Sequence, residues 1–109
     1  MSTKTKILVV DNDLATLSRI YLALVHRNYK VEASDKQEEI AERIKRFRPA
    51  ILIIGAEEYL SQKGKIKIPC IVLAEKEKLE GITPDDEVFP MENPVPIDTL
   101  VRTIDDLVI

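Results

Sequence analysis

Three neighbouring polar residues, Asp11, Asn12 and Asp13, follow a short apolar run near the start of the chain. Carboxylate oxygens are ligands that Mg²⁺ prefers, so Asp11 and Asp13 could hold this cation with help from Glu57 or Glu58. Asp13 has a simpler role as a helix N-cap, because helical spacing starts at the next residue. Asp11 alone would bind Mg²⁺ weakly. We therefore expect no cofactor, with Mg²⁺ as the one candidate.

The other reactive side chains indicate no catalytic group. Cys70 is the single cysteine and opens an apolar run, so we interpret it as a small core residue in a reducing compartment. His26 lies near the end of a predicted helix without a partner at ligand spacing, which is typical of a surface histidine. We expect no enzymatic activity.

Length and composition indicate one soluble domain spanning residues 1–109. Apolar residues make up 45% and charged residues 32% of the chain, as in ordinary globular proteins. The formal net charge of −3 gives no bias towards nucleic acid or an anionic membrane. The first apolar run is too short for a signal peptide or a membrane span, so we expect a cytoplasmic protein.

The elements that position these residues alternate between strand and helix patterns. Five apolar residues run without a break between Pro49 and Gly55, which is typical of a strand buried on both faces of a parallel sheet. Similar short runs predict four further strands. Apolar and polar residues alternate in the strand at 29–34, and the strand at 87–91 contains a proline, and both features are typical of edge strands. These further strands are Ile7–Val10, Tyr29–Ser34, Cys70–Ala74 and Glu87–Met91.

Apolar residues at helical spacing separate the strands. The predicted helices run from Leu14 to near Asn28, over Lys36–Arg48, over a turn or two at Glu75–Glu80, and from Ile97 to Leu107 or Val108. Residues 57–67 predict at most a short helix or a turn. This alternation favours an α/β, flavodoxin-like, doubly wound sheet of five parallel strands in the order 2-1-3-4-5. The third helix should be shortened or missing.

Three segments of this pattern carry a family resemblance: Lys6–Asp13, Pro49–Ile54 and Asn93–Leu100. The first resembles the opening of the receiver domains of bacterial two-component response regulators. The second resembles their third strand, and the third resembles the Lys-Pro-Phe segment before their last helix, whose Lys-Pro peptide is typically cis. Gly55 follows Asn12 by 43 positions, which fits the family's distance from metal-binding carboxylate to phosphoacceptor. The resemblance covers essentially the whole chain.

The resemblance implies a phosphorelay mechanism with defined positions. A histidine kinase transfers a phosphoryl group to an aspartate after the third strand, while two acidic residues after the first strand hold Mg²⁺. A Thr or Ser after the fourth strand and a Lys after the fifth then bind the phosphoryl group. In this chain these positions are Asp11, Asn12, Gly55, Ala74 and Asn93.

Four of the five positions have lost the required group. Gly55 has no nucleophile, Asn12 is a neutral amide, Ala74 has no hydroxyl and Asn93 has no positive charge. Together these losses remove the reaction, so the sequence predicts a degenerate receiver, or pseudo-receiver. Gly55 to Pro69 is also roughly ten positions shorter than the family pattern, about the length of an average helix.

Three functions follow for such a chain. The first is a non-enzymatic interaction module in signal transduction that docks a protein partner (a histidine kinase, another regulator or a scaffold) or a second copy through residues 75–109. The alternative is a sensor for a small ligand or an ion at the remodelled site. The third, a functioning phosphoacceptor with Glu57 as a substitute, is the least favoured because Glu57 would be badly aimed.

Overall fold

The computed structural model describes residues 4–108 and contains a single sheet of five parallel strands. The strands are β1 (Lys6–Val10), β2 (Lys30–Ser34), β3 (Ile51–Gly55), β4 (Cys70–Ala74) and β5 (Val88–Glu92). Their order is β2-β1-β3-β4-β5, as the sequence predicts. The three central strands are apolar and buried, and the two edge strands are the alternating one and the proline-bearing one.

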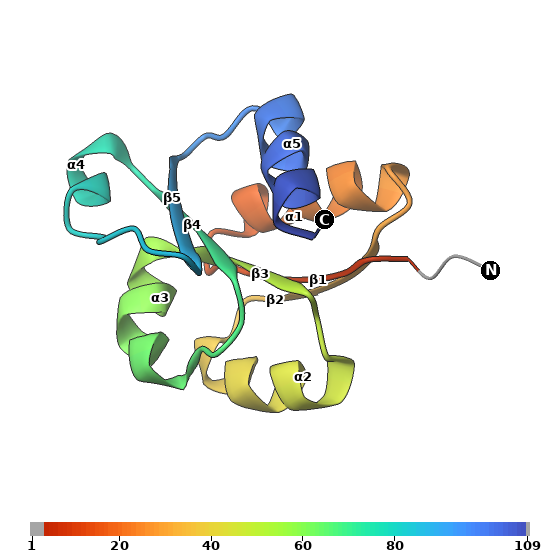
Figure 1. Cartoon of the computed structure of the whole chain (residues 1–109), viewed down its shortest axis with the longest axis horizontal. Coiled ribbons are helices and arrows are strands. Elements are labelled where there is room, and N and C mark those ends of the chain that lie inside the picture. The colour runs from red at the N-terminus through yellow and green to blue at the C-terminus, as the bar shows by residue number, and fades with distance from the viewer. Residues whose placement is uncertain (1–3, 109) are drawn as a thin grey trace.

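Helices cover both faces of the sheet (Figure 1). The α-helices are α1 (Leu14–His26), α2 (Ile40–Phe47), α3 (Ala56–Gln62), α4 (Lys76–Leu79) and α5 (Ile97–Val108), and short 3-10 turns occur at Gln37–Glu39 and Lys63–Lys65. Helices α1 and α5 lie on one face, and α2 and α3 lie on the other. No helix within residues 4–108 is long and apolar enough to cross a membrane.

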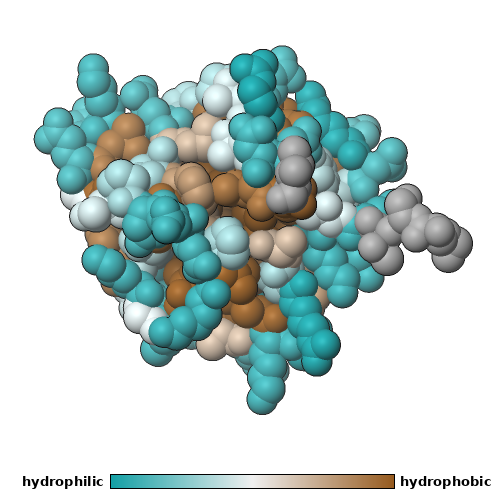
Figure 2. Space-filling model, viewed as in Figure 1, coloured by the Kyte–Doolittle hydropathy of each residue, from teal (hydrophilic) through white to brown (hydrophobic). Residues whose placement is uncertain are grey.

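Each face of the sheet packs its own apolar core. One core joins Ile20, Leu24 and Ile104 to alternate strand residues, and the other joins Ile40 and Tyr59 to the residues between them. Figure 2 shows polar side chains around the rim of one face of the molecule and apolar residues gathered towards its middle. Because one core covers each face of the sheet, both faces of the central strands are buried, and their sequences are unbroken apolar runs.

Local signals set the helix ends as expected. Asp13 is the N-cap of α1, where its side chain accepts a hydrogen bond from the Ala15 N–H. Asn28, just after α1, adopts a left-handed φ of 68°. Helix α2 ends before Pro49 at Arg48, which is also left-handed with a φ of 54°. The buried Cys70 is a core residue, and burial raises the pKa of its thiol to about 11.

Helix α3 is a short helix, as the sequence allows for residues 57–67. It spans seven residues and starts directly after β3 with no intervening loop. Ala56 and Tyr59 are both buried in the core beside α2, which gives this short helix an apolar face. Two apolar residues three positions apart are too weak a periodic signal to set the bounds of this helix from the sequence.

Candidate functional site

The five positions that the resemblance assigns to phosphorylation lie together at the carboxyl ends of the strands. Asp11 and Asn12 follow β1, Gly55 and Ala74 end β3 and β4, and Asn93 follows β5. All five line one small cavity of about 140 Å³. Ligand sites of parallel α/β sheets lie at this same end. The remaining lining residues include Asp13, Glu57, Glu58 and Lys78.

Gly55 matters here for the space that it leaves and not for its backbone conformation. Its φ of −68° and ψ of 154° are open to any residue. A β-carbon added at Gly55 would lie 2.5 Å from Oε2 of Glu58 and 3.2 Å from Cγ of Asp11. The first distance is well below van der Waals contact. The Glu58 carboxylate therefore fills the space that a side chain at position 55 would need.

Helix α3 delivers Glu58 to this position. Because the helix begins at Ala56, Glu58 lies in its first turn and its side chain reaches back over the end of β3. Glu58 is only 3% exposed, and its Oε1 accepts a hydrogen bond of 3.0 Å from the backbone N–H of Asn12. A carboxylate in the first helical turn is also favoured by the helix dipole. This contact ties α3 to the loop after β1.

The loop after β1 is held by its own carboxylates. Oδ1 of Asp11 accepts a hydrogen bond of 2.9 Å from the N–H of Asp13. The Asp13 carboxylate caps α1, with its two oxygens accepting from the Ala15 N–H at 3.3 Å and from the Thr16 hydroxyl at 2.7 Å. The Asp13 side chain is thus engaged in capping.

Asp11 holds its proton more tightly than an ordinary aspartate. Burial raises the pKa of Asp11 from 3.8 to about 6. The hydrogen bond from the Asp13 N–H opposes this shift, while the negative charges of Glu58, Asp13 and Glu57 add to it. The site therefore places acidic groups close together in a partly water-excluded environment.

These residues do not fit the Mg²⁺ ion that the receiver fold implies. Within residues 4–108, no three His, Cys, Asp or Glu side chains converge as metal ligands. Asp13 is engaged at the helix cap, and Glu58 is engaged with the Asn12 N–H. Glu57, the third metal candidate, points to the rim of the cavity, where it forms an ion pair of 3.1 Å with Lys78 of α4.

On the far side of the cavity, the positions that the resemblance assigns to a hydroxyl and a cation are Ala74 and Asn93, which supply neither. Asn93 donates its backbone N–H to the Ala74 carbonyl over 2.9 Å, and its Oδ1 atom is buried without a hydrogen-bond partner. The Asn93–Pro94 peptide is cis, as the resemblance predicts. The one cation at the cavity among the described residues comes instead from Lys78.

Sequence reasoning named Glu58 only as a possible helper in cation binding and missed its role at Gly55. Its partner, Asn12, lies 46 positions away in the sequence, so no local spacing connects the two. The sequence does place a glutamate three positions after Gly55. This spacing brings the Glu58 carboxylate back to Gly55 only because the helix begins at Ala56, which the sequence does not show.

Several solved structures similar to this one are response-regulator receiver domains. A response regulator signal receiver domain from Bermanella marisrubri matches with a TM-score of 0.79 and 22% identity, covering 98% of this chain and all of that one. A response regulator from Desulfuromonas acetoxidans matches with a TM-score of 0.76 and 19% identity, covering 94% of this chain and 95% of that one. A CheY-like receiver domain from Methylobacillus flagellatus matches with a TM-score of 0.76 and 8% identity, covering 96% of this chain and 99% of that one. No protein-family model matches the sequence, and no curated protein is significantly similar to it. This chain therefore has the response-regulator receiver fold over nearly its whole length.

Asp11→Asn tests the raised pKa of Asp11. The folded protein keeps the Asp11 proton up to about pH 6, whereas the unfolded chain releases it near 3.8, so the aspartate destabilises the fold increasingly between these two values. The amide removes the charge and can still accept from the Asp13 N–H. We expect the variant to gain on the order of 1–3 kcal/mol in free energy of unfolding above about pH 7, and nothing near pH 4.

Urea denaturation at both pH values measures this difference. Asp86→Asn serves as a control, because Asp86 is an exposed carboxylate away from the cavity. A gain of the same size at both pH values, or an equal gain for Asp86→Asn, would show that Asp11 is not a strained buried acid.

Gly55→Ala tests the occupation of the site by Glu58. In the wild type the added methyl group must displace the Glu58 carboxylate, and we expect a loss of about 1–2 kcal/mol in free energy of unfolding. In a Glu58→Ala background the same change should be neutral or stabilising by about 0.4–1 kcal/mol, as for glycines in unstrained conformations. A double-mutant cycle by urea denaturation measures the coupling.

Gly64→Ala provides the matched control, because a β-carbon at Gly64 meets no atom within 4 Å. It should have the same small effect with or without Glu58. Independence of Gly55→Ala and Glu58→Ala would mean that Glu58 does not fill the space beside Gly55.

Proposed function

We propose that this protein is a receiver-fold interaction module in signal transduction that works without phosphorylation at the position of the usual aspartate. The observation that carries the proposal is the closeness of Glu58 to Gly55, where Oε2 lies 2.5 Å from the place of a β-carbon. The position has no nucleophile, and a carboxylate from the next helix already fills its space. We infer that the chain catalyses no reaction at this site.

The neighbouring groups support this proposal. Phosphoryl transfer depends on positioning and on positive charge around the moving oxygens. Here the cavity holds Asp11, Glu57 and Glu58, and its one lysine, Lys78, is paired with Glu57. An incoming phosphoryl group would therefore meet carboxylates.

The cavity volume does not favour the alternative of a metabolite sensor. Pockets for drug-sized ligands usually enclose about 300–1,000 Å³. The site cavity, at about 140 Å³, has room for only a few water molecules at roughly 30 Å³ each. We therefore place the interaction function first.

The face formed by α4, β5 and α5, within residues 75–109, has the features of a docking surface for a protein partner. Helix α4 has only four residues, and β5 remains partly exposed from Val88 to Met91. Apolar residues at a partly covered sheet edge can be buried by a partner. We propose that a histidine kinase, another regulator or a scaffold binds this face, with a homodimer through it as the alternative.

Treatment with a small phosphodonor and Mg²⁺ tests the loss of phosphorylation. Intact mass measurement should show no phosphoryl addition, because no nucleophile lies at position 55. A receiver domain with an intact acceptor aspartate, treated in parallel, should gain one phosphoryl group and thereby validate the donor. A stable one-phosphoryl gain on this chain would overturn the proposal.

Charge reversal tests the docking face. Arg102 is exposed on α5, and Lys45 is exposed on α2 on the opposite face of the sheet. In pull-downs from the native cell, Arg102→Glu should recover several-fold less of the protein that the wild type retains, because rim charges steer association. Lys45→Glu should recover the wild-type amount. The reverse pattern would place the partner on the α2 face.

A further inference from the structure

The outer edge of β2 is open to another strand. The Lys30 N–H donates to the Thr5 carbonyl over 3.0 Å, and the Ser34 carbonyl accepts from the Asp11 N–H over 3.2 Å. These residues therefore face β1, and backbone direction alternates along a strand. Val31 and Ala33 between them direct their N–H and C=O groups away from the sheet. Such unpaired groups form a template for strand addition.

The opposite edge of the sheet is blocked. In β5, the Glu87 carbonyl accepts from Cys70 and the Asn93 N–H donates to Ala74, so the odd-numbered residues face β4. Pro90 therefore faces outward, where it has no N–H to offer a further strand. The described sheet can continue through β2 without this obstacle.

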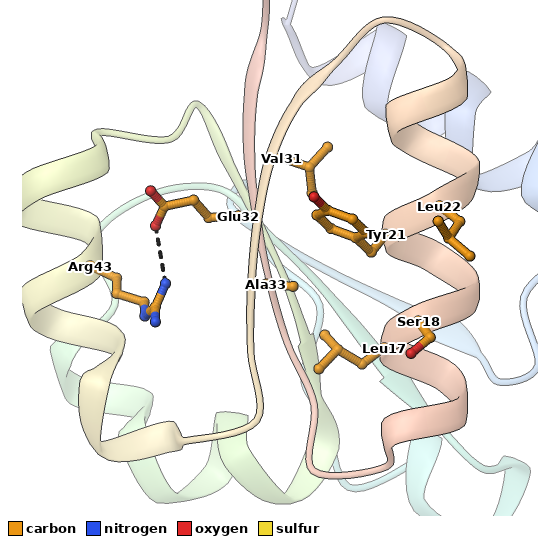
Figure 3. Close-up of a pocket in the computed structure, with 8 residues that line it drawn as sticks. All are labelled: Leu17, Ser18, Tyr21, Leu22, Val31, Glu32, Ala33 and Arg43. Atoms are coloured by element: carbon orange, nitrogen blue, oxygen red, sulfur yellow. Dashed lines mark hydrogen bonds and ion pairs between the residues drawn. The ribbon is translucent and has the colours of Figure 1, made fainter.

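A groove with apolar side chains from α1 and β2, and with Glu32 and Arg43 also in its lining, accompanies the open edge. Figure 3 shows Val31 and Ala33 on the side of β2 that faces α1, with Tyr21 and Leu22 projecting from that helix. A hollow of about 520 Å³ lies between them, and an adjoining hollow of about 390 Å³ extends towards Leu14. Four of the six large apolar side chains that are exposed within residues 4–108 lie on α1: Leu14, Tyr21, Leu22 and Val25. Such a concentration marks an interaction surface.

We propose that a second copy of this chain occupies this edge, with the two β2 strands paired antiparallel about a two-fold axis at Val31. The outward backbone groups of Val31 would pair with those of the partner's Val31. This register sets Lys30 opposite the partner's Glu32, and the reverse, so two cross-strand charge pairs form. A register shifted to pair Val31 with the partner's Ala33 would oppose Glu32 to itself, which is repulsive.

The same register matches the other face of the strand. There Val31 meets its own copy, and the ring of Tyr29, whose N–H already donates to the Leu24 carbonyl, lies opposite the partner's Ala33. Glu32 is on the opposite side of β2, where it forms an ion pair of 3.2 Å with Arg43 (Figure 3). The α1 helices of the two copies would flank the junction and cover Leu22. The dimer would leave the α4–β5–α5 face free for a partner.

Sedimentation equilibrium of the purified full chain at concentrations up to roughly 1 mM tests this dimer. The wild type should be in a monomer–dimer equilibrium. Leu22→Lys should weaken dimerisation by about tenfold or more, since it places a charge in the groove. Leu60→Lys on α3 is the matched control, because Leu60 and Leu22 are 56% and 55% exposed. The control should dimerise like the wild type.

Charge swapping tests the register independently of the groove. Lys30→Glu and Glu32→Lys should each dimerise weakly alone, because like charges then face each other across the junction. Mixing the two variants should restore a heterodimer, since each charge now meets its opposite. This recovery also controls for the loss of the Glu32–Arg43 ion pair.

Three results would overturn the proposal. The wild type could stay monomeric at every concentration. Its dimer could be weakened by Arg102→Glu but not by Leu22→Lys, which would place it on the α4–β5–α5 face. The mixed charge variants could also fail to associate more strongly than each alone.

Discussion

One carboxylate fills the space beside Gly55 at the end of β3, and the contacts around the site depend on it. Glu58 supplies it from the first turn of α3, and the absence of a side chain at Gly55 makes the room. The Glu58 carboxylate also satisfies the Asn12 N–H, and so joins α3 to the loop that starts α1. An aspartate at position 55 and this placement of Glu58 exclude each other sterically. With glycine at position 55, the Glu58 carboxylate takes this space and forms a contact that joins α3 to the loop after β1.

The contact of Glu58 with Asn12 also places a second carboxylate beside Asp11. Asp11 shares the site with Glu58, and its raised pKa reflects its burial together with this neighbouring negative charge. Buried acidic groups without a cation destabilise a fold near neutral pH. At the rim, Lys78 of α4 forms an ion pair with Glu57 of α3 and so offsets part of the negative charge. The two edge strands of the sheet, β2 and β5, lie outside this group of acidic residues. We propose that the chain works through these edges, with a partner at the α4–β5–α5 face and a second copy at β2.

Much of the fold could be predicted from the sequence because its signals are local. The unbroken apolar run before Gly55, the cap at Asp13, the left-handed Asn28 and the proline in β5 each act within a few residues. The extent of α3 could not be predicted, because its apolar face depends on where Ala56 and Tyr59 pack. The resemblance assigned five positions to a site, and in the structure these five residues line one cavity. The contact of Glu58 with Asn12 joins distant parts of the chain, so only the folded arrangement reveals it.

Amide hydrogen exchange at Asn12, followed by NMR, tests the central claim most directly. A backbone N–H bonded to a buried carboxylate exchanges slowly, whereas one at an open loop does not. In the wild type the Asn12 amide should be protected. In Glu58→Ala its protection should fall by about tenfold or more, while the amides of β1 stay protected. An Asn12 amide that exchanges at the same rate in both proteins would contradict the claim that Glu58 holds this site.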